Sequence, residues 1–543
     1  MAFLTRTHGV GFAALALGLG VFLSRILGLV RDKIISYHFG AGAEADIYFA
    51  AFVVPDFLNY LMAGGYFSIT LVPLLSLSFA DKGEAGTQSF LSAAVCWAAL
   101  CIGLLTGAAW AAAPLLAPLA APGFSPEETR RLTHFLRIIL PAQACFLPGA
   151  CFTALLYYRR QFIVPALSPL LYNICIIFGG LAFRYALPER GMEGFCWGAL
   201  AGAFLGGLLF PLLAARAGGL VFKPRLRHPR MKELLFLALP LMLGQSIAAL
   251  DEQFLRIFGS LAGEGGVSLL NYARRIMMVP VGVVAQAGGL AAYPFLAALA
   301  ANGDMEKFLR TARSAAGNIL ILALPLTVWM QTAAWPIMRL IFQQGGFSAA
   351  HAAESGLLLC VMLFAVPATA MQQIAGRAFY AQRDTLTPAL IGTLVTLAVL
   401  PLYFFCAHKA GAAGVAGAGA FGVILYAVLL CRRLRTKLRQ TAALRNSSPQ
   451  EIAFFGSGEV AGKALPALAC SLPAGACSLG ALLVLNPVCS PDALGAAVLT
   501  AASGAAFALA YLLCAKRFAP FLLEPLTALL RAVRRRFSGQ GGT

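Results

Sequence analysis

The chain has 543 residues, of which 60% are hydrophobic and only 12% are charged, and its formal net charge is +19. Soluble domains carry about 25% charged residues, so this composition excludes a typical soluble protein and places most of the chain in lipid. An excess of positive charge can also indicate nucleic-acid binding. Here the basic residues lie between apolar runs, so we expect membrane lipids, and no nucleic acid, as partners.

Apolar stretches of about 20 residues, the length that crosses a bilayer as a helix, recur along the whole chain. They predict an all-α polytopic membrane protein with about 14 transmembrane helices. The first six predicted spans are 9–36, 45–79, 88–117, 130–157, 163–186 and 192–215. Six more follow at 233–258, 266–299, 309–342, 352–380, 387–407 and 412–431, and the last two are 465–486 and 492–515.

Basic residues gather in three segments that separate or follow these groups of spans. The predicted parts are an N-lobe at 1–218, a basic linker at 219–232, a C-lobe at 233–440, a second linker at 441–464, two further helices at 465–515 and a basic tail at 516–543. Cytoplasmic loops are enriched in Lys and Arg. We therefore expect a multi-pass protein of the bacterial inner membrane with both termini in the cytoplasm. The predicted outer loops include 40–44, 122–128, 263–266 and 343–348.

An internal repeat supports the two-lobe organisation. The sequence Pro-Gly-Phe-Ser at 122–125 recurs as Gly-Gly-Phe-Ser at 345–348, an offset of 223 residues. At the same offset, Tyr157, Arg160 and the Pro-Ala-Leu at 165–167 correspond to Tyr380, Arg383 and the Pro-Ala-Leu at 388–390. The repeat therefore predicts two six-helix lobes with the same orientation in the membrane. Such a repeat places a transport site between the lobes near mid-membrane.

Ionisable residues inside the spans are the candidate site. A charge at a helix centre costs at least about 2.5–3.5 kcal/mol on insertion, so it usually faces a partner or an aqueous cavity. Such residues gather in the first two predicted helices of each lobe. They are Arg25, Arg31, Asp32, Asp46 and Asp56 in the first lobe, and Asp251, Glu252, Arg256, Arg274 and Arg275 in the second.

Two interpretations of these charges remain open. Arg31–Asp32 and Asp251–Arg256 could be structural ion pairs, or the set could line a cavity. Arginine stays charged and binds phosphate through two parallel hydrogen bonds. Arginines that face a common space would therefore suggest a phosphate or pyrophosphate ligand, with the acidic residues holding them in place.

Enzyme motifs are weak in this chain. The G-x-G-x-x-G match at 417–422 lies in a Gly/Ala-rich span, where close helix packing is the better explanation. Neither G-x-x-x-x-G-K-[ST] nor H-E-x-x-H is present, and the 13 cysteines are scattered without metal spacing. We expect a transporter with no cofactor and no metal site. A membrane glycosyltransferase or ligase would need a larger polar loop than the chain offers.

Several motifs together resemble the MurJ/MviN family. The first-helix stretch at 24–32, Ser-Arg-Ile-Leu-Gly-Leu-Val-Arg-Asp, carries the resemblance, together with Asp46, Tyr-Ala-Arg-Arg at 272–275 and Ala-Phe-Tyr-Ala at 378–381. The resemblance covers about residues 1–440. It implies two six-helix lobes plus two extra helices that form a groove for a lipid tail. It also implies a flippase that moves lipid II, the undecaprenyl-pyrophosphate-linked peptidoglycan precursor, from the inner to the outer leaflet by alternating access.

The resemblance implies site residues as well. Arg25, Arg31, Asp32, Asp46 and Arg275 occupy positions of the family's substrate cavity. The chain departs from the family pattern at Asn59, where an arginine is usual, and at Arg274, where an acidic residue is common. Residues 387–405 lack the Asn and Asp that bind a sodium ion in some members.

Four residues are accessory candidates. Arg274 and Asn59 are the departures from the family pattern, and Asp251 and Arg256 are charged residues of the second lobe. Arg274 could supply the charge lost at Asn59, or could pair with Asp56 or Asp251. The alternative functions are a flippase for another polyprenyl-linked glycan, such as O-antigen or capsule, and a drug/cation antiporter of the same superfamily. The antiporter would favour a more acidic cavity. We expect a monomer whose substrate partner is an undecaprenyl-pyrophosphate-linked lipid.

Overall fold

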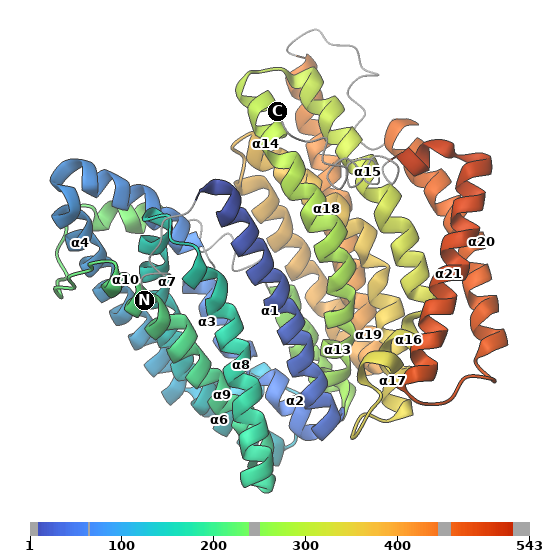
Figure 1. The fold of residues 1–543 in the computed structure, drawn as a ribbon, viewed down its shortest axis with the longest axis horizontal. Coiled ribbons are helices and arrows are strands. Elements are labelled where there is room, and N and C mark those ends of the chain that lie inside the picture. Colours follow the sequence, from blue (N-terminus) through green and yellow to red (C-terminus); the bar gives the residue numbers. More distant parts are fainter. Residues whose placement is uncertain (1–8, 63–65, 238–249, 444–457, 525–543) are drawn as a thin grey trace. The chain divides into compact units, whose positions relative to one another are not determined.

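The computed structural model describes residues 9–62, 66–237, 250–443 and 458–524, and all regular elements in these ranges are helices (Figure 1). Among the described residues, 11 helical stretches are long and apolar enough to cross a membrane. The prediction of an all-α polytopic membrane protein is therefore confirmed. The predicted span 233–258 falls partly outside the described residues.

Two long helical stretches contain breaks where the sequence predicted separate spans. In α4 (Tyr66–Ala111), Lys82 and Gly83 leave helical geometry, and Gly83 has a φ of 60°. In α19 (Leu386–Ala443), Gly411 has a φ of 56°. Glycine adopts positive φ at little cost because it has no Cβ. Both breaks fall in the gaps predicted between spans, at 80–87 and 408–411.

The chain divides into two compact units, Met1–Asn271 with Gly345–Phe347, and Tyr272–Gln344 with Ser348–Thr543. The first boundary falls inside α13 (Gly266–Pro280). The α-helices of the first unit are α1 (Val10–Phe39), α2 (Ala43–Ala50), α3 (Val53–Met62), α4, α5 (Ala113–Ala120), α6 (Pro126–Ile139), α7 (Gln143–Tyr158), α8 (Ile163–Ala186), α9 (Gly191–Gly202), α10 (Phe210–Ala217) and α12 (Leu250–Gly259). A π-helical turn, Ala203–Leu209, joins α9 to α10.

Close helix packing in the first unit depends on glycine. Helices α8 and α9 lie side by side (Figure 1), and a Cβ on Gly194 would lie 2.4 Å from the carbonyl oxygen of Gly179. Small residues of this kind let helix backbones approach closely in membranes.

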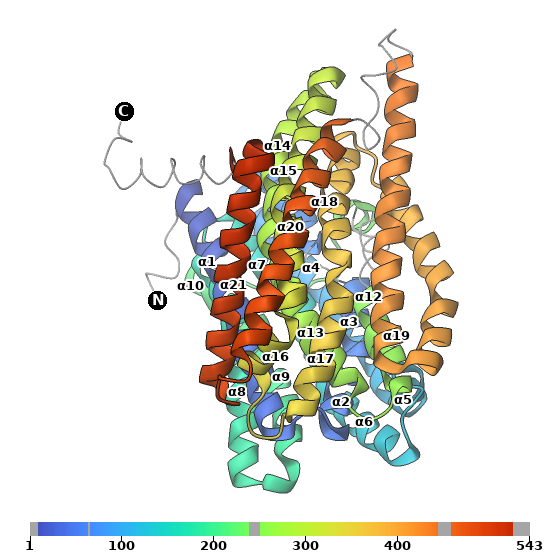
Figure 2. The same ribbon diagram turned by 90° about the vertical axis from the view of Figure 1, so that its right-hand side faces the viewer.

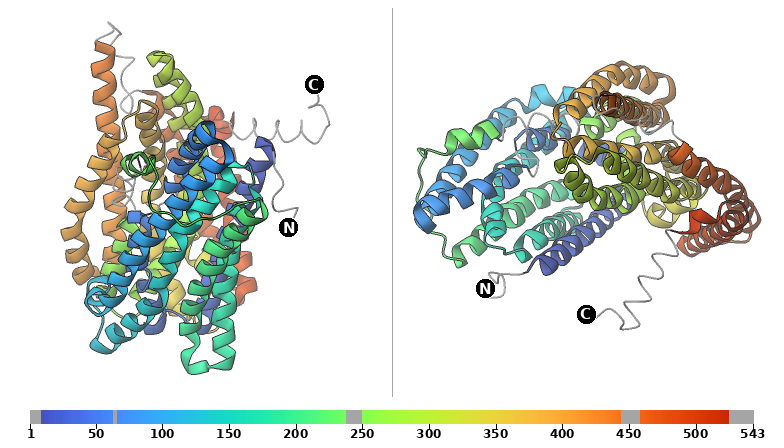
Figure 3. Two further views of the ribbon diagram at one scale, coloured as in Figure 1. Left: turned by 90° about the vertical axis from the view of Figure 1, so that its left-hand side faces the viewer. Right: turned by 90° about the horizontal axis from the view of Figure 1, so that it is seen from above.

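The basic linker lies along α4, where Trp97 Nε1 donates a 2.7 Å hydrogen bond to the carbonyl oxygen of Leu226 (Figure 3, left).

The second unit contains the remaining part of α13 and the helices that follow it. These are α14 (Ala287–Ala301), α15 (Met305–Thr332), α16 (Ala334–Phe342), α17 (Ala349–Leu363), α18 (Ala365–Ala381), α19, α20 (Gly458–Leu485) and α21 (Ala493–Phe518). A second π-helical turn, Val281–Gln286, joins α13 to α14. Helices α20 and α21 form a pair that packs against α15 and α16 (Figure 2).

Local geometry recurs at the positions that the internal repeat relates. Ser125 and Ser348 both cap the helices that follow them, each accepting a hydrogen bond from the backbone N–H three residues later. Arg160 and Arg383 have φ values of 56° and 58°, and they are the two non-glycine residues with positive φ among the described residues. Positive φ is rare outside glycine. Its recurrence at an offset of 223 agrees with two copies of one ancestral unit.

Candidate functional site

The first candidate residues, Arg31 and Asp32, form an ion pair within α1. Arg31 Nη2 lies 2.8 Å and Nε 3.0 Å from Asp32 Oδ1. Asp32 is 2% exposed and the Arg31 side chain is 14% exposed. Adjacent helical residues point about 100° apart, so the arginine side chain bends back to reach its neighbour. The pair compensates the buried carboxylate and the half-buried guanidinium, and it fixes the direction of the guanidinium.

Two tyrosines lie near this pair. Tyr48 on α2 and Tyr172 on α8 lie close enough to Arg31 to interact with it electrostatically. Tyr48 is 1% exposed, and its hydroxyl is buried without a hydrogen-bond partner. Buried hydroxyls are normally hydrogen-bonded. Tyr48 therefore offers unused hydrogen-bonding capacity beside Arg31. An isolated tyrosine in an apolar span carries no sequence signal, so Tyr48 was not among the predicted site residues.

Asp46 has backbone partners instead of the arginine partners that we expected. Its Oδ2 accepts a 2.7 Å hydrogen bond from the Gly265 N–H, and its Oδ1 accepts one of 2.7 Å from the Ser268 N–H. Asp46 is 2% exposed. The first N–H groups of a helix have no partner within the helix. Asp46 therefore caps the start of α13 from α2, across 219 and 222 residues of sequence.

The loops predicted to face outside meet around this contact. The Ala43 N–H donates to Glu264 Oε1 at 3.3 Å, and a Cβ on Gly265, whose φ is +83°, would lie 2.7 Å from the Ala41 carbonyl oxygen. The Gly346 N–H donates a 2.7 Å hydrogen bond to the Tyr37 carbonyl oxygen. The first two contacts join the loops 40–44 and 263–266, and the third joins Gly346 to the end of α1, just before the loop 40–44.

The fourth predicted outer loop, 122–128, contacts the end of α12. The Gly123 N–H donates a 3.1 Å hydrogen bond to Ser260 Oγ, and a Cβ on Gly123 would lie 2.1 Å from the Ser260 carbonyl oxygen. Only glycine permits this approach of two backbones. Residues 40–44, 122–128, 263–266 and 345–347 belong to the first unit, so this end of the unit is tied together by hydrogen bonds and close backbone packing.

A second charged cluster centres on Arg256. Its Nη1 lies 2.8 Å from Asp56 Oδ2 and its Nη2 lies 2.9 Å from Glu252 Oε1. Nε also donates a 3.3 Å hydrogen bond to Asn271 Oδ1. Arg256 is 9% exposed. The partner expected from the sequence was Asp251, whose side chain lies outside the described residues. Asp56, which we considered as a partner for Arg274, is instead paired with Arg256.

The other candidate residues lie at other positions of the described helices. Arg25 is exposed on α1, seven residues and nearly two helical turns before Asp32. Asn59 is half-buried on α3. Arg274 and Arg275 are half-buried on α13 and belong to the second unit. Within the described ranges, no group of three or more His, Cys, Asp or Glu side chains could hold a metal ion.

Asp384, which lies just before α19, contacts residues near both ends of that helix. It accepts hydrogen bonds from the N–H and the hydroxyl of Thr387 and forms an ion pair with Lys437. Burial alone would raise the pKa of Asp384, but Lys437 and Thr387 outweigh it and lower the pKa below its ordinary value. The charged carboxylate thus ties the two halves of α19 together, on either side of the Gly411 break.

Comparison with known proteins gives consistent matches along most of the chain. The family model described as lipid II flippase MurJ matches residues 35–462. The probable lipid II flippase MurJ of Rhizobium meliloti (strain 1021) is 28% identical over 423 residues, which cover 75% of this chain and 78% of that protein. The lipid II flippase MurJ of Burkholderia cenocepacia is 25% identical over 448 residues, which cover 80% of this chain and 84% of that protein.

Two solved structures show the fold. A lipid II flippase MurJ in an inward closed conformation matches with a TM-score of 0.75 at 22% identity, covering 94% of this chain and 100% of that one. An inward-facing MATE-family multidrug resistance transporter of the MOP superfamily matches with a TM-score of 0.65 at 16% identity, covering 80% and 99%. At these identities the structural similarity shows the fold alone.

Proposed function

Because the chain belongs to the lipid II flippase MurJ family, we propose that it carries lipid II across the cytoplasmic membrane, as a multi-pass transporter and not as an enzyme. The observation within the chain that best supports this is the buried Arg31–Asp32 pair in α1. A buried charge inside a membrane helix is costly, and it is retained where it serves a ligand or ion pathway. The family match agrees with the resemblance seen in the sequence motifs.

Pyrophosphate recognition is the role that we assign to the arginines. A guanidinium has five N–H donors, and Asp32 accepts from the Nε and Nη2 groups of Arg31. The other donors can bind phosphate oxygens, with the Tyr48 hydroxyl as an additional group. Arg25 and Arg275 would complete the positive charge, while Asp32 orients Arg31.

Alternating access gives Asp46 a different role, as part of an outer gate. While the outer loops are tied together, the substrate would enter from the cytoplasmic side. Transport then requires the Asp46 contacts to Gly265 and Ser268 to break, which opens the outer end and lets the precursor leave toward the outer leaflet. Pairing of Arg256 with Asp56 would hold α12 against α3 during this cycle.

The proposed orientation places the basic linkers, the tail and both termini in the cytoplasm. Lys and Arg are enriched in cytoplasmic loops, and the linker along α4 is strongly basic. The α20–α21 pair would offer its apolar outer surface to the polyprenyl tail, and the transporter would act as a monomer. Another polyprenyl-linked glycan is the competing substrate. The description of the matched family, lipid II flippase, favours lipid II.

Depletion of the protein in living cells tests the proposal. We expect lipid II to become inaccessible to a lipid II-cleaving enzyme added outside the cell, because the precursor would remain in the inner leaflet. Re-expression of the wild-type chain or of Arg130→Ala, which removes an exposed arginine on α6, should restore cleavage. Arg31→Ala should not restore it. Unchanged cleavage after depletion, with another polyprenyl-linked glycan retained inside, would assign the flippase to that glycan.

A further inference from the structure

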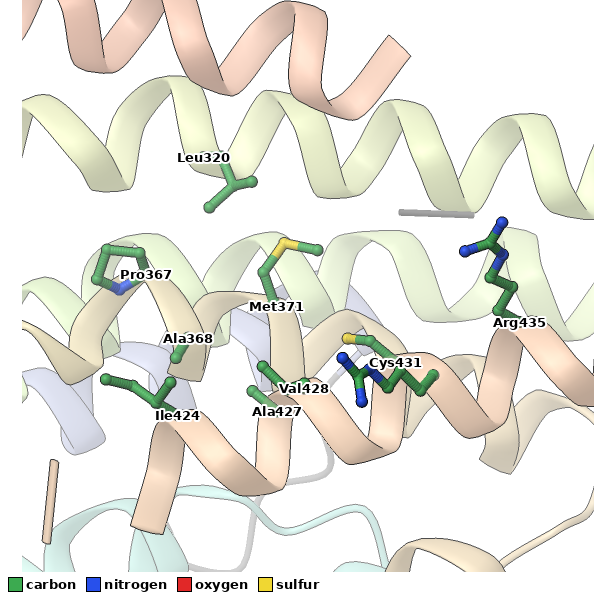
Figure 4. A pocket seen from close by; sticks show the side chains of 10 residues that line it. Leu320, Pro367, Ala368, Met371, Ile424, Ala427, Val428, Cys431 and Arg435 are labelled. Atoms are coloured by element: carbon green, nitrogen blue, oxygen red, sulfur yellow. The ribbon is translucent and has the colours of Figure 1, made fainter. Parts of the chain in front are cut away.

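The second unit contains a cavity of about 430 Å³ between α15, α18 and α19 (Figure 4). Leu320 comes from α15, Met371 from α18, and Ile424 and Val428 from α19, and these side chains make its body apolar. Arg432 and Arg435 of α19 also line it. In Figure 4, Arg435 lies at one end of the row of side chains, and Ile424 lies toward the other. The volume is within the range of about 300–1,000 Å³ that is typical of ligand pockets.

The positive charge at this cavity comes from Arg432, which is exposed, and Arg435, which is half-buried. Arg435 Nε is buried and has no hydrogen-bond partner. In the part of the chain that the structure describes, neither Arg432 nor Arg435 forms an ion pair with a carboxylate. Lys437, on the same helix, is paired with Asp384. Among the described residues, Lys437 is thus compensated by a carboxylate, whereas the buried Nε of Arg435 has no acceptor. A buried N–H without a partner is unfavourable, so this end of the cavity favours an anionic ligand.

An apolar body with two guanidinium groups fits an amphiphile with an anionic head. A guanidinium group can donate two parallel hydrogen bonds to the oxygens of one phosphate. Basic pockets between membrane helices bind anionic lipid head groups. A free inorganic anion would leave the apolar part of the cavity unfilled. We propose that this cavity binds a phospholipid with an anionic head group, whose phosphate contacts Arg432 and Arg435 and whose acyl chain lies along Leu320, Met371 and Ile424.

This lipid site is separate from the proposed transport residues. It is lined by α15, α18 and α19, whereas the transport residues lie on α1, α2, α3, α12 and α13. A lipid in the cavity would bridge three helices of the second unit and strengthen their packing. The site therefore goes beyond the proposed function, and its test does not depend on transport.

Lipid binding to the purified full-length protein is the test. Native mass spectrometry would follow titration of phosphatidylglycerol, with phosphatidylcholine as the zwitterionic comparison. For the double variant Arg432→Gln/Arg435→Gln, we expect about tenfold weaker binding of phosphatidylglycerol, because two charge-assisted contacts are lost. Arg433→Gln is the matched control, since Arg433 is an exposed neighbour outside the lining. It should change binding by less than about twofold.

A second variant removes the acyl-chain space while keeping both arginines. Met371→Trp should fill the cavity and weaken phosphatidylglycerol binding as strongly as the double variant does. Equal losses in the double variant and in Arg433→Gln would indicate diffuse surface charge and overturn the proposal. Wild-type affinity in Met371→Trp would overturn it as well. Undecaprenyl pyrophosphate is the remaining probe: if it binds at this cavity and phosphatidylglycerol does not, the occupant is the transported lipid and the phospholipid assignment is wrong.

Discussion

The Ser268 backbone N–H donates a 2.7 Å hydrogen bond to Oδ1 of Asp46, 222 residues earlier in the chain. The second carboxylate oxygen accepts from Gly265, at the same distance. An anionic side chain at a helix N-terminus satisfies free N–H groups and interacts favourably with the helix dipole. The cap of α13 is thus supplied by another helix, and its loss would release one predicted outer loop from another.

Asp46→Ala should therefore open the outer end of the first unit. Hydrogen bonds to charged groups contribute about 1.5–3 kcal/mol each. A cysteine introduced at Ala41, which is 4% exposed beneath the 263–266 loop, should react faster with an impermeant maleimide in the Asp46→Ala background. Glu44→Ala is the control, because it removes an acid of the same helix that pairs with Arg131 of α6 and not with the start of α13. Equal labelling in both backgrounds would contradict the gate.

The Arg256 cluster predicts a stability effect that depends on which partner is removed. Arg256→Gln leaves Asp56 and Glu252 without their shared cation, so the free energy of unfolding should fall by about 1–3 kcal/mol. A lower melting temperature of the purified protein would report this. Asp56→Asn in the Arg256→Gln background should recover part of the loss, because one uncompensated acid is gone. A double variant less stable than Arg256→Gln alone would show that the cluster is not an electrostatic unit.

The fold could be predicted from the sequence where the signals are local. Hydropathy marks most of the membrane-spanning helices, although the predicted span 45–79 is divided among α2, α3 and the start of α4. The break at Gly411 follows from a residue type that tolerates positive φ. The Arg31–Asp32 pair was among the possibilities because the two residues are adjacent. The recurrent motifs at one offset predicted the repeat, and two of their residues, Ser125 and Ser348, cap the helices that follow them.

The rest of the site depends on helix placement, which the sequence does not encode locally. The partners of Asp46 are backbone N–H groups, and these have no side-chain signature. Arg256 could have paired with Asp251, five residues away, yet its described partners include Asp56, 200 residues away. The unused hydroxyl of Tyr48 becomes visible only when the surrounding helices bury it.

The orientation can be tested with a cysteine at Ala350, an exposed position at the start of α17. Gly346 is less suitable, because a Cβ there would lie 3.1 Å from the Gly40 nitrogen. A cysteine at Ala350 should react with an impermeant maleimide added outside the cell, above the labelling of the wild-type chain. A cysteine at Arg227, in the basic linker, should not react. The reverse pattern would place the linkers outside and overturn the orientation.

The Asp384 clamp predicts an acid-dependent loss of stability. The pKa of Asp384 in the folded protein is below its ordinary value of 3.8, so the clamp stabilises the fold fully above that value. The contribution is lost as the pH falls through the lower folded pKa. The difference in melting temperature between the wild type and Asp384→Asn should be constant near neutral pH and shrink below pH 3.8. Glu354→Gln, at an exposed acid on α17, should show no such trend.

Arg274 and Asn59 provide the most specific test of how the positive charge has been rearranged. If Arg274 supplies the charge that the family usually carries at the position of Asn59, Arg274→Asp should impair flipping without reducing the amount of folded protein. Adding Asn59→Arg should then restore much of the activity, because an arginine again contributes bidentate phosphate contacts. If Arg274 serves instead as a structural partner, Arg274→Asp should lower the folded yield, and Asn59→Arg should not recover it.

If Arg274 is a structural partner, Asp56 is the less favoured of its two candidate acids, because Asp56 is already paired with Arg256. Adjacent helical positions point about 100° apart, so Arg274 and Arg275 face different directions on α13, and Arg275→Ala is the matched comparison. Flipping measured in parallel with folded yield for Arg274→Asp, Arg275→Ala and Arg274→Asp/Asn59→Arg separates the two roles. Normal flipping and normal yield in Arg274→Asp would contradict both, and would leave Arg25, Arg31 and Arg275 as the arginines that the proposed pyrophosphate site requires.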